Sequence, residues 1–530
     1  MRKVVRGAST RVQQFLTPLR TLGLIILLSS FLSLCLVVTR RPWCDEAWFA
    51  DIAYNLLKHG TMGMRVLDPH GFPFTPYVKD IDRFTYWVMP GYALFQAVWY
   101  KVVGFGLFAM RGISVFWAAI SLWAWYEIVV RLTRDRFLAL VAVALLGTDN
   151  LFVMCAATGR MDMMCAAMGL AGIAIYLILR EDHLLLAIGL SSTICAAAVF
   201  THPNGVFATL GLAIIAVLLD RRRLTLPSVV LAALPFLIFG SLWGAYIMRA
   251  PDVLVAQMKA QGSTPHRLEL PLNPFELVEA VRREIVLRYV APYNLSTDSP
   301  ARLLSNVFYS YLAAIAVLIA VPRFRRQRQV KWLLLAAAVQ FVFLACLQKN
   351  WYYLVYILPL LWTIYAMAFC NLWRLPGARK WPLLLWTALL VSLNFGLIGA
   401  HTLHDTYKNR FLAATGFLKA HLKPGSFVLG SGELAFELGF DGQVVDDARL
   451  GILSEKHELP QYIVLESQYK YYWFPTLRVY EPETYRQMTH LLDSRYDLVY
   501  DQSKSSFPSY GFSDRPYEIY ERQSYDHTDD

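Results

Sequence analysis

Long apolar runs separated by short polar turns fill the chain up to residue 401. Eleven of these runs contain roughly 16 to 22 residues, close to the ~20 that a helix needs to cross a bilayer. Each run therefore predicts a transmembrane helix. The runs cover residues 21–39, 111–131, 137–155, 162–179, 184–200, 204–219, 227–248, 304–321, 332–348, 351–371 and 381–401.

One further apolar run, residues 88–103, is interrupted by Pro90-Gly91 and carries Gln96 and Lys101. If this run does not cross the membrane, every short basic turn falls on one side, as the positive-inside rule requires. Counting it as a span breaks that alternation at the turn containing Arg131. We therefore assign residues 88–103 to an interfacial helix. In the resulting topology, residues 1–20 are cytoplasmic, residues 21–403 form the membrane domain, and loops 40–110 and 249–303 lie outside.

Residues 404–530 have the composition of a soluble domain. Short runs rich in β-branched and aromatic residues alternate with helical stretches such as 483–492, and Pro-Gly and Asp-Gly pairs mark turns. We predict a small α/β domain on the outer face, whose many tyrosines either pack inside it or line a glycan-binding surface. The predicted strands are 426–429, 443–445, 462–465, 496–500 and 517–520.

Composition supports a polytopic α-helical membrane protein, because 56% of the residues are hydrophobic and only 17% are charged. The net charge of +11 does not indicate nucleic-acid binding, since most clustered Lys and Arg lie in the short turns that orient membrane proteins. Seven cysteines show no metal-binding spacing and imply no disulfide framework.

An Asp-Glu pair, Asp45-Glu46, follows the first apolar run directly. Downstream apolar residues recur at helical spacing, so Asp45 is predicted to open an amphipathic helix on the bilayer surface, with Asp51, Asn55 and Lys58 on its polar face. Two interpretations of the pair remain open. Asp45 is either an N-cap with Glu46 favoured by the helix dipole, or the pair carries chemistry.

Other ionisable residues converge on the same predicted face, where such groups are costly unless they are paired, hydrated or functional. Each also has a structural interpretation: a local ion pair for Arg160 and Asp162, a cap for His202, an aromatic belt around Lys349, and a solvated loop for Arg83. Arg160 departs from the positive-inside pattern, which suggests that it binds an anion.

Several of these motifs occur in an order that resembles a known superfamily. Asp45-Glu46 after the first span, Tyr86-Trp87-x-x-Pro90 before an apolar helix, and Gly159-Arg160-Met161-Asp162 are similar to landmarks of the GT-C superfamily of polyprenyl-phosphate-sugar-dependent glycosyltransferases. Within it, the resemblance is to the branch of protein O-mannosyltransferases and lipid A aminoarabinose transferases, and it covers about residues 20–400. Further landmarks in the same order are Arg111, Asp149-Asn150, Thr201-His202-Pro203-Asn204-Gly205 and Tyr356-Ile357-Leu358-Pro359.

The chain also departs from that branch. His202-Pro203 stands where the aminoarabinose transferases have Lys-Gly, and Trp87-Val88-Met89-Pro90 stands where they have Glu-Lys-Pro. The particular sugar is therefore not carried over. The Trp-Trp-Asp-Tyr-Gly motif of oligosaccharyltransferases is absent from the sequence.

The resemblance implies an inverting transfer, in which a hexose or pentose leaves a polyprenyl phosphate for a hydroxyl of a lipid, glycan or protein. The charge pattern places the active site and the C-terminal domain on the outer face. The absence of an exported Cys pair and of a eukaryotic sorting signal favours a multi-pass protein of a bacterial inner membrane, in which both would be periplasmic. No cofactor, metal or nucleic acid is expected, and the partners are the lipid-linked donor, the acceptor and membrane lipids. The candidate roles are catalysis by Asp45 with Glu46 secondary, phosphate binding by Arg160, Arg83, Lys349 and His202, and a pocket lined by Asp162, Trp87, Tyr86 and Tyr356.

A transporter or flippase of a lipid-linked sugar is the alternative function. Transporters are typically built from repeats and broken helices near the bilayer midplane. The sequence indicates neither, which favours the enzyme.

Overall fold

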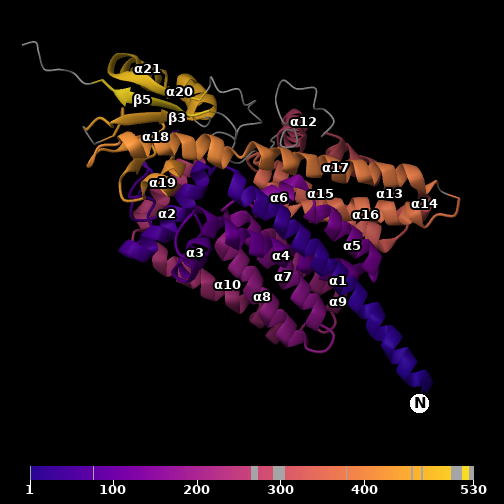
Figure 1. The fold of residues 1–530 in the computed structure, drawn as a ribbon. Helices are drawn as coiled ribbons and strands as arrows, with labels where there is room; N and C mark the ends of the chain where they lie inside the picture. Colours follow the sequence, from indigo (N-terminus) through magenta and orange to yellow (C-terminus); the bar gives the residue numbers. More distant parts are fainter. Residues whose placement is uncertain are drawn as a thin grey trace, which may run out of the picture.

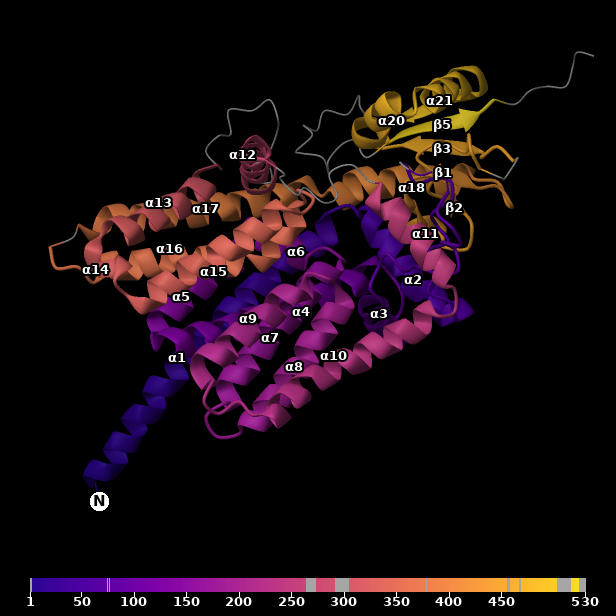
Figure 2. The same ribbon diagram turned by 180° about the vertical axis from the view of Figure 1, so that it is seen from behind.

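A helical body carries a small β-sheet at one end, and the N-terminal part of the first helix projects from the other end (Figure 1). Figure 2 shows the same separation from behind. The computed structural model describes residues 2–73, 75, 77–263, 273–290, 305–377, 379–454, 458–466, 469–502 and 516–523.

The first half of the body consists of long helices joined by short turns. It contains α1 Arg2–Thr39, α2 Cys44–His59, α3 Pro90–Val103, α4 Leu107–Thr133, α5 Arg136–Gly147, α6 Asn150–Ala156, α7 Met161–Leu179, α8 Leu184–Thr201, α9 Gly205–Asp220 and α10 Leu226–Ile247.

The second half begins with short helices from the loop at 249–303, whose residues 264–272 and 291–304 lie outside the described part. It contains α11 Pro251–Gly262, α12 Pro274–Arg283, the π-helix η1 Glu284–Val290, α13 Ser305–Ala320, α14 Pro322–Arg325, α15 Arg328–Ala345, the 3₁₀ helix η4 Trp351–Tyr356, α16 Leu358–Trp373 and α17 Lys380–His404.

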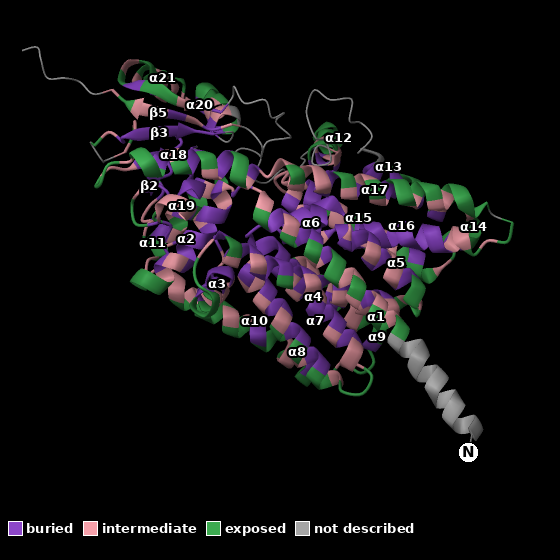
Figure 3. Ribbon diagram, in the orientation of Figure 1, coloured by how far each residue is buried: buried purple, intermediate pink, exposed green. Residues whose placement is uncertain are grey.

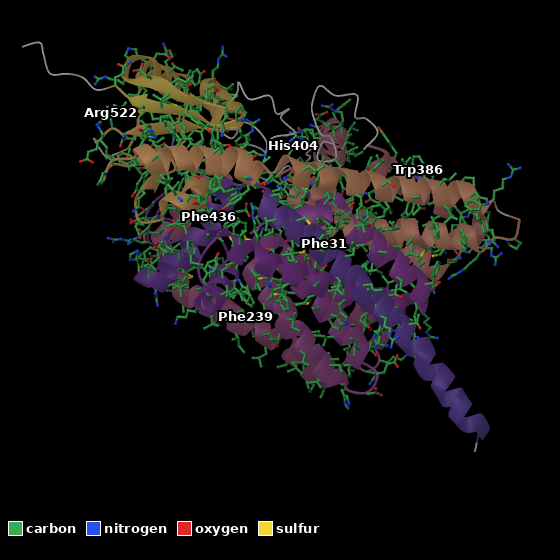
Figure 4. All side chains as sticks on the ribbon, in the orientation of Figure 1. Phe31, Phe239, Trp386, His404, Phe436 and Arg522 are labelled. Carbon is green, nitrogen blue, oxygen red and sulfur yellow. The ribbon has the colours of Figure 1, made fainter. Side chains whose placement is uncertain are left out.

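All eleven predicted spans fall on helices. In the described part of the chain, seven helices are long and apolar enough to cross a membrane, an eighth candidate is the pair α5–α6, and the shorter helices α9, α13 and α16 are also apolar. Many apolar side chains, including Phe31 and Trp386, stay exposed on this helical layer, as expected for surfaces that face lipid (Figures 3 and 4).

The predicted continuous span 137–155 is wrong in one respect, because α5 and α6 meet at an angle of 67°. The Asp149 carboxylate caps α6 by accepting a hydrogen bond from the Phe152 amide at 3.0 Å, and it also accepts one from Trp362 Nε1 at 3.2 Å. Such local capping competes with continuation of the helix. The expectation of no broken helix therefore fails here, and it no longer counts against a transporter.

α3 is 14 residues long, or about 21 Å at 1.5 Å per residue, which is too short to cross a hydrocarbon core of about 30 Å. The structure thus agrees with leaving residues 88–103 out of the set of spans. Its placement along the membrane surface stays a prediction.

Basic turns that are distant in sequence contact one another in two groups. Arg374 pairs with Asp135 at 2.5 Å, which joins the turn after α16 to the turn between α4 and α5. Arg180 pairs with Asp220 at 2.6 Å, and Arg223 donates a hydrogen bond to the Arg180 carbonyl at 2.9 Å, which joins the turns after α7 and α9. Within each group the turns lie together, in agreement with the charge pattern, and the side of the membrane stays a prediction.

The predicted polar face of α2 is not a solvated face. Asp51 and Asn55 are both fully buried. Asp51 accepts a hydrogen bond from the Val66 amide at 2.7 Å, and Asn55 donates one to Asp51 at 2.8 Å. The loop that follows α2 folds back over this face, so only Lys58 of the three predicted polar residues remains exposed.

The C-terminal sheet contains all five predicted strands. They are β1 Val428–Gly430, β2 Val444–Val445, β3 Tyr462–Leu465, β4 Tyr496–Asp501 and β5 Glu518–Arg522. The order is β2-β1-β3-β5-β4, with β1 parallel to β2 and β3, and β5 antiparallel to β3 and β4. Helical segments accompany the sheet: η5 Tyr407–Leu412, α18 Ala413–His421, η6 Gly432–Leu434, α19 Ala435–Leu438, η7 Tyr469–Trp473, α20 Phe474–Tyr480 and α21 Pro482–Arg495.

Four tyrosines of this region belong to its core, whereas Tyr472 and Tyr480 are exposed. Tyr462, Tyr469, Tyr496 and Tyr517 are all buried. This favours the packing interpretation over a glycan-binding surface for these four side chains. In Figure 1, α18 and α19 lie between the sheet and α2. The C-terminal region contacts the segment that carries the Asp-Glu pair, because Trp48 of α2 donates to Asp446.

Candidate functional site

Asp45 lies in the first turn of α2, and its side chain is 17% exposed. Trp43, not Asp45, occupies the N-cap position, so the N-cap interpretation of Asp45 is wrong. Asp45 Oδ2 pairs with Arg160 Nη1, while Oδ1 lies 3.7 Å from the Cys44 thiol. Burial raises the pKa of the Asp45 carboxyl, although Arg160 opposes this shift.

Glu46, the next residue, is 1% exposed and fully engaged. It accepts hydrogen bonds from Arg111 Nε at 2.8 Å and Arg111 Nη2 at 2.7 Å, and from the backbone amides of Gly159 at 2.7 Å and Trp43 at 3.1 Å. Burial opposes ionisation, but Arg111 and these bonds hold the pKa of Glu46 below its ordinary value. Glu46 therefore joins α2 to the starts of α4 and α7.

Arg160 precedes α7 and is 5% exposed. Besides the pair with Asp45, its Nε donates to Asp162 Oδ2 at 3.0 Å, and its Cζ lies 3.6 Å from the centre of the Tyr352 ring. Its Nη2 makes no hydrogen bond to any residue in the described part of the chain. Arg160 does form the local ion pair with Asp162, and it forms a second ion pair with Asp45.

Asp162 is 1% exposed and lies in the first turn of α7. Its Oδ1 atom is buried and accepts no hydrogen bond from the described residues. A buried acceptor without a partner costs about 1–3 kcal/mol. The atom is thus available to a hydroxyl group of a bound molecule.

His202 lies at the end of α8, beside the aromatic residues of η4. Its Nδ1 accepts a hydrogen bond from the Asn204 amide at 3.1 Å, so part of its role is to cap the turn. Its ring lies 5.8 Å from that of Tyr353 and 6.3 Å from that of Tyr356. The predicted pocket residue Tyr356 therefore lies next to His202.

Lys349 is buried rather than open to solvent, with a side chain 4% exposed. Its Nζ donates to the Leu347 carbonyl at 3.0 Å and lies 3.6 Å from Glu284 Oε2. The carboxylate of Glu284 also lies 3.3 Å from Arg288 Nε. One buried acid thus lies within 4 Å of two cations whose side chains are also buried.

The sequence analysis did not identify Arg288 as a candidate site residue. It lies in loop 249–303, and its Cζ is 5.6 Å from the Tyr353 ring, which also contacts His202. Arg282, Arg283 and Arg288 occur in one charged stretch that is typical of a solvated loop. No sequence pattern distinguishes the fully buried Arg288 from its exposed neighbour Arg282.

The contacts of the remaining predicted residues are with other groups. The Arg83 side chain is 71% exposed, with Nε 4.0 Å from Asp82 Oδ2, as expected for a solvated loop. Tyr86 is buried, and its hydroxyl donates to the Tyr246 carbonyl at 3.2 Å. The Trp87 ring lies 5.2 Å from that of Phe72.

An apolar cavity of about 610 Å³ opens beside the cluster. Cys165, Asn204, Gly205 and Tyr356 line the part near His202 and Asp162. Residues of α4, α7, α9, α15 and α16 line the rest, as far as Arg328. The described part of the chain holds no group of three or more His, Cys, Asp or Glu side chains placed to bind a metal ion.

Comparison with solved structures gives matches over almost the whole chain. ArnT from Cupriavidus metallidurans bound to undecaprenyl phosphate matches with 14% identity and a TM-score of 0.55, over 94% of this chain and 97% of that one. The oligosaccharyltransferase of Archaeoglobus fulgidus in the apo form matches with 11% identity and a TM-score of 0.56, over 95% and 75%. AglB from the same organism, in complex with an inhibitory peptide and a dolichol-phosphate, matches with 10% identity and a TM-score of 0.52, over 93% and 74%.

These neighbours are membrane glycosyltransferases of the GT-C superfamily. The chain has the GT-C fold, as its motifs implied: a polytopic helical body with a small C-terminal sheet. No protein-family model matches the chain, and no curated protein matches it by sequence.

Proposed function

We propose that this protein is an inverting glycosyltransferase that moves a sugar from a polyprenyl-phosphate donor to an acceptor hydroxyl. The observation that carries the proposal is that the Asp45–Arg160 pair and an apolar cavity of about 610 Å³ both adjoin η4: Arg160 lies against the Tyr352 ring, and Val355 and Tyr356 line the cavity. The Asp45–Arg160 pair offers acid–base and anion-binding groups, and the cavity offers room for a lipid tail. A lipid-linked anion fits this combination.

Cations around the aromatic residues of η4 would hold the donor phosphate. Arg160 has Nη2 free of described partners, and a guanidinium suits bidentate contact with phosphate oxygens. Arg288 and Lys349 supply two further cations beside Glu284, and Arg288 lies 5.6 Å from the Tyr353 ring. His202 lies between these groups, beside Tyr353. Together they would stabilise the phosphate as it gains charge on leaving.

Asp45 would act as the general base. In the transfer, the acceptor oxygen forms a bond to the anomeric carbon while the bond from that carbon to the phosphate oxygen breaks. The acceptor proton passes to Asp45, and the polyprenyl phosphate leaves. Removal of the proton by a positioned base typically contributes about 100-fold to 10,000-fold. Glu46 is less suited to this role, because all its described contacts hold it ionised and enclosed.

Asp162 and the cavity would orient the donor. The unpartnered Oδ1 of Asp162 would accept a hydrogen bond from a sugar hydroxyl. The lipid tail would lie along the cavity between α4, α7, α9 and α15, where the lining is almost entirely apolar. Loop 249–303 brings Arg288 to the site and would close over the donor.

Two of the structural neighbours support this donor class, since one is bound to undecaprenyl phosphate and another to a dolichol-phosphate. The side of the membrane follows from the basic turns, which we assign to the cytoplasm. The active site and the C-terminal region would then be periplasmic in a bacterial inner membrane. The acceptor would be a lipid, glycan or protein.

The experiment supplies membranes containing the protein with polyprenyl-phosphate donors labelled in the sugar, presented as separate hexose and pentose pools. We expect free polyprenyl phosphate to form and the label to appear in a new linkage. Membranes from cells lacking the protein provide the matched control. If the labelled donor crosses the membrane intact with no polyprenyl phosphate released, the protein is a transporter and the proposal fails.

A further inference from the structure

Two contacts between the C-terminal region and the start of α2 flank Asp45, one on each side. Arg41 precedes Asp45 by four residues, and Trp48 follows it by three. Both residues bind acids of the C-terminal region that lie about 400 residues further along the chain. Neither contact involves the phosphate-binding candidates.

Trp48 makes the first contact through its indole nitrogen. Its Nε1 donates to Asp446 Oδ2 at 2.8 Å. Asp446 is 3% exposed, and it also accepts hydrogen bonds from the Gly432 amide at 2.8 Å and the Tyr469 hydroxyl at 2.8 Å. Two donors of the C-terminal region therefore orient the Asp446 carboxylate independently of Trp48.

Gly432 makes the close approach of Trp48 possible. A Cβ atom at this position would lie 3.1 Å from Asp446 Oδ2 and 3.3 Å from Trp48 Cδ1. Both contacts are tighter than side chains normally tolerate. The indole therefore packs directly against the backbone at the start of η6.

The loop after α2 strengthens the same junction. The Asp446 amide donates to the Val66 carbonyl at 2.7 Å, and the Asp68 amide donates to the Asp446 carbonyl at 3.0 Å. Since Val66 also binds Asp51 of α2, Asp446 is connected to the helix by its side chain and by its backbone.

Arg41 makes the second contact. Its Nη2 lies 2.7 Å from Glu466 Oε2, with both side chains under 5% exposed. Its Cζ lies 5.0 Å from the centre of the Tyr517 ring, and its backbone amide donates to Thr406 Oγ1 at 3.0 Å. The segment that enters α2 is thus anchored as firmly as the turn that follows Asp45.

We propose that Asp446 and Glu466 are positioning residues for Asp45, so that the C-terminal region sets the place of the general base relative to Arg160 and the donor. Hydrogen bonds are directional, and a misplacement of about 1 Å at a reacting group costs up to ~100-fold in rate. The proposal rests on the function proposed above.

The test compares Trp48→Phe with Lys58→Met in purified detergent-solubilised protein. Trp48→Phe removes the indole donor to Asp446 but keeps an aromatic ring. Lys58→Met is the matched control, because Lys58 also joins α2 to the C-terminal region, through Asp441 at 2.5 Å, but this pair is more than 40% exposed and 13 residues beyond Asp45. Thermal unfolding is recorded for each protein, so that rates refer to folded molecules.

For Trp48→Phe we expect kcat to fall about tenfold, within the range for a misplaced catalytic group, while KM for the donor changes less than about twofold. Amide hydrogen exchange in peptides covering residues 44–53 should accelerate, with no change in peptides from α7. Lys58→Met should match the parent in all three measurements. Asp446→Asn keeps an acceptor for Trp48 and should restore most of the rate that Asp446→Ala loses.

A folded Trp48→Phe variant with the kcat and the exchange rates of the parent would overturn the inference. A fall in kcat with unchanged exchange in residues 44–53 would also overturn it, because the helix would then not have loosened. If the parent transfers no sugar, the proposed function fails, and the exchange data alone decide whether Asp446 holds α2 in place.

Discussion

Asp45 and Glu46 are adjacent in the chain, yet they belong to two different regions of the molecule. Glu46 points into the joint between α2, α4 and α7, where Arg111 binds both of its oxygens and also donates to the Val37, Arg40 and Arg41 carbonyls. Asp45 pairs with Arg160, which lies against the Tyr352 ring of η4, and keeps some exposure. Because successive residues of a helix point in different directions, Glu46 enters the structural joint while Asp45 reaches the candidate reaction centre.

The two carboxyls also shift their pKa values in opposite directions. For Glu46, the paired guanidinium and two backbone amides outweigh burial and lower the pKa. For Asp45, burial outweighs Arg160 and raises the pKa. A carboxylate with a raised pKa is the better proton acceptor near neutral pH. A buried carboxylate whose oxygens all have hydrogen-bond donors therefore indicates a structural role. A carboxylate that is only partly bonded and lies near a cavity indicates a catalytic one.

Glu46→Gln should produce the largest effect, and it tests whether Glu46 has a structural role. It leaves Arg111 buried without its counter-charge, which costs about 3–5 kcal/mol. We expect poor expression and a strongly lowered unfolding transition, measured by thermal unfolding in detergent. Arg131→Gln provides a control, because it removes one exposed partner of a surface pair. A well-folded Glu46→Gln variant without transfer activity would move the base from Asp45 to Glu46.

Asp45→Asn should have the next largest effect, on rate rather than on stability. Asn keeps the shape of the side chain and cannot accept the acceptor proton, so we expect transfer to fall at least ~100-fold. The unfolding transition and polyprenyl phosphate binding should stay close to those of the parent. Activity within a few-fold of the parent would remove Asp45 from the mechanism.

The pH profile of the parent sharpens this result. Because Asp45 must be ionised to act as a base, kcat should rise with pH through its pKa. Since burial raises that pKa, the acidic limb should lie above the ordinary carboxyl range near pH 4. A limb at or below that range would contradict the assignment of the base to Asp45.

Arg160→Ala should have a smaller effect, concentrated on the donor. Loss of one charge-assisted contact is worth about 1.5–3 kcal/mol, so we expect donor use to weaken about 10-fold to 100-fold. Arg160→Lys should restore part of it, because an ammonium keeps the charge but not the bidentate geometry. Both variants are measured for KM and kcat with labelled donor. Parent-like kinetics in both would make Arg160 a structural partner of Asp45 and Asp162 only.

Glu433→Gln should give the smallest effect and concerns the region that holds Arg41. Burial raises the pKa of Glu433 from 4.5 to about 8, and the groups that face it are Ser431, Glu466, Arg41, Asp446 and Tyr517. A raised pKa means that its contribution to stability is complete below about pH 4.5 and is lost as the pH rises towards 8.

The unfolding transition of the parent should therefore fall over that interval, and Glu433→Gln should fall less, because Gln does not titrate. The two proteins are compared by thermal unfolding from pH 5 to 8. Asp446, whose pKa burial raises to about 7, contributes a fall of the same sign that remains in the variant. Parallel curves for the two proteins would exclude Glu433 as the source.

The apolar pattern determined where the helices lie, because a run of about 20 apolar residues has few stable alternatives in a bilayer. Alternation of β-rich runs and turns likewise located all five strands. The break between α5 and α6 escaped prediction, because the apolar run continues through Asp149, whereas in the structure the Asp149 carboxylate caps a new helix at the Phe152 amide. Trp362, more than 200 residues away, donates to the same carboxylate. Helical periodicity places Asp51 and Asn55 on a solvated face. The periodicity does not show that the loop after α2 folds back and buries both side chains.

By itself, the sequence determined the helices, the strands, the grouping of the basic turns and the stretch that carries Asp45 and Glu46. These features depend on local composition and spacing, which a chain carries in its order of residues. Only the tertiary structure separated Asp45 from Glu46, buried Lys349 beside Glu284, left Arg83 exposed and brought Arg288 to Tyr353. Those outcomes depend on which distant groups share a buried volume, where each charge must find a partner or remain costly.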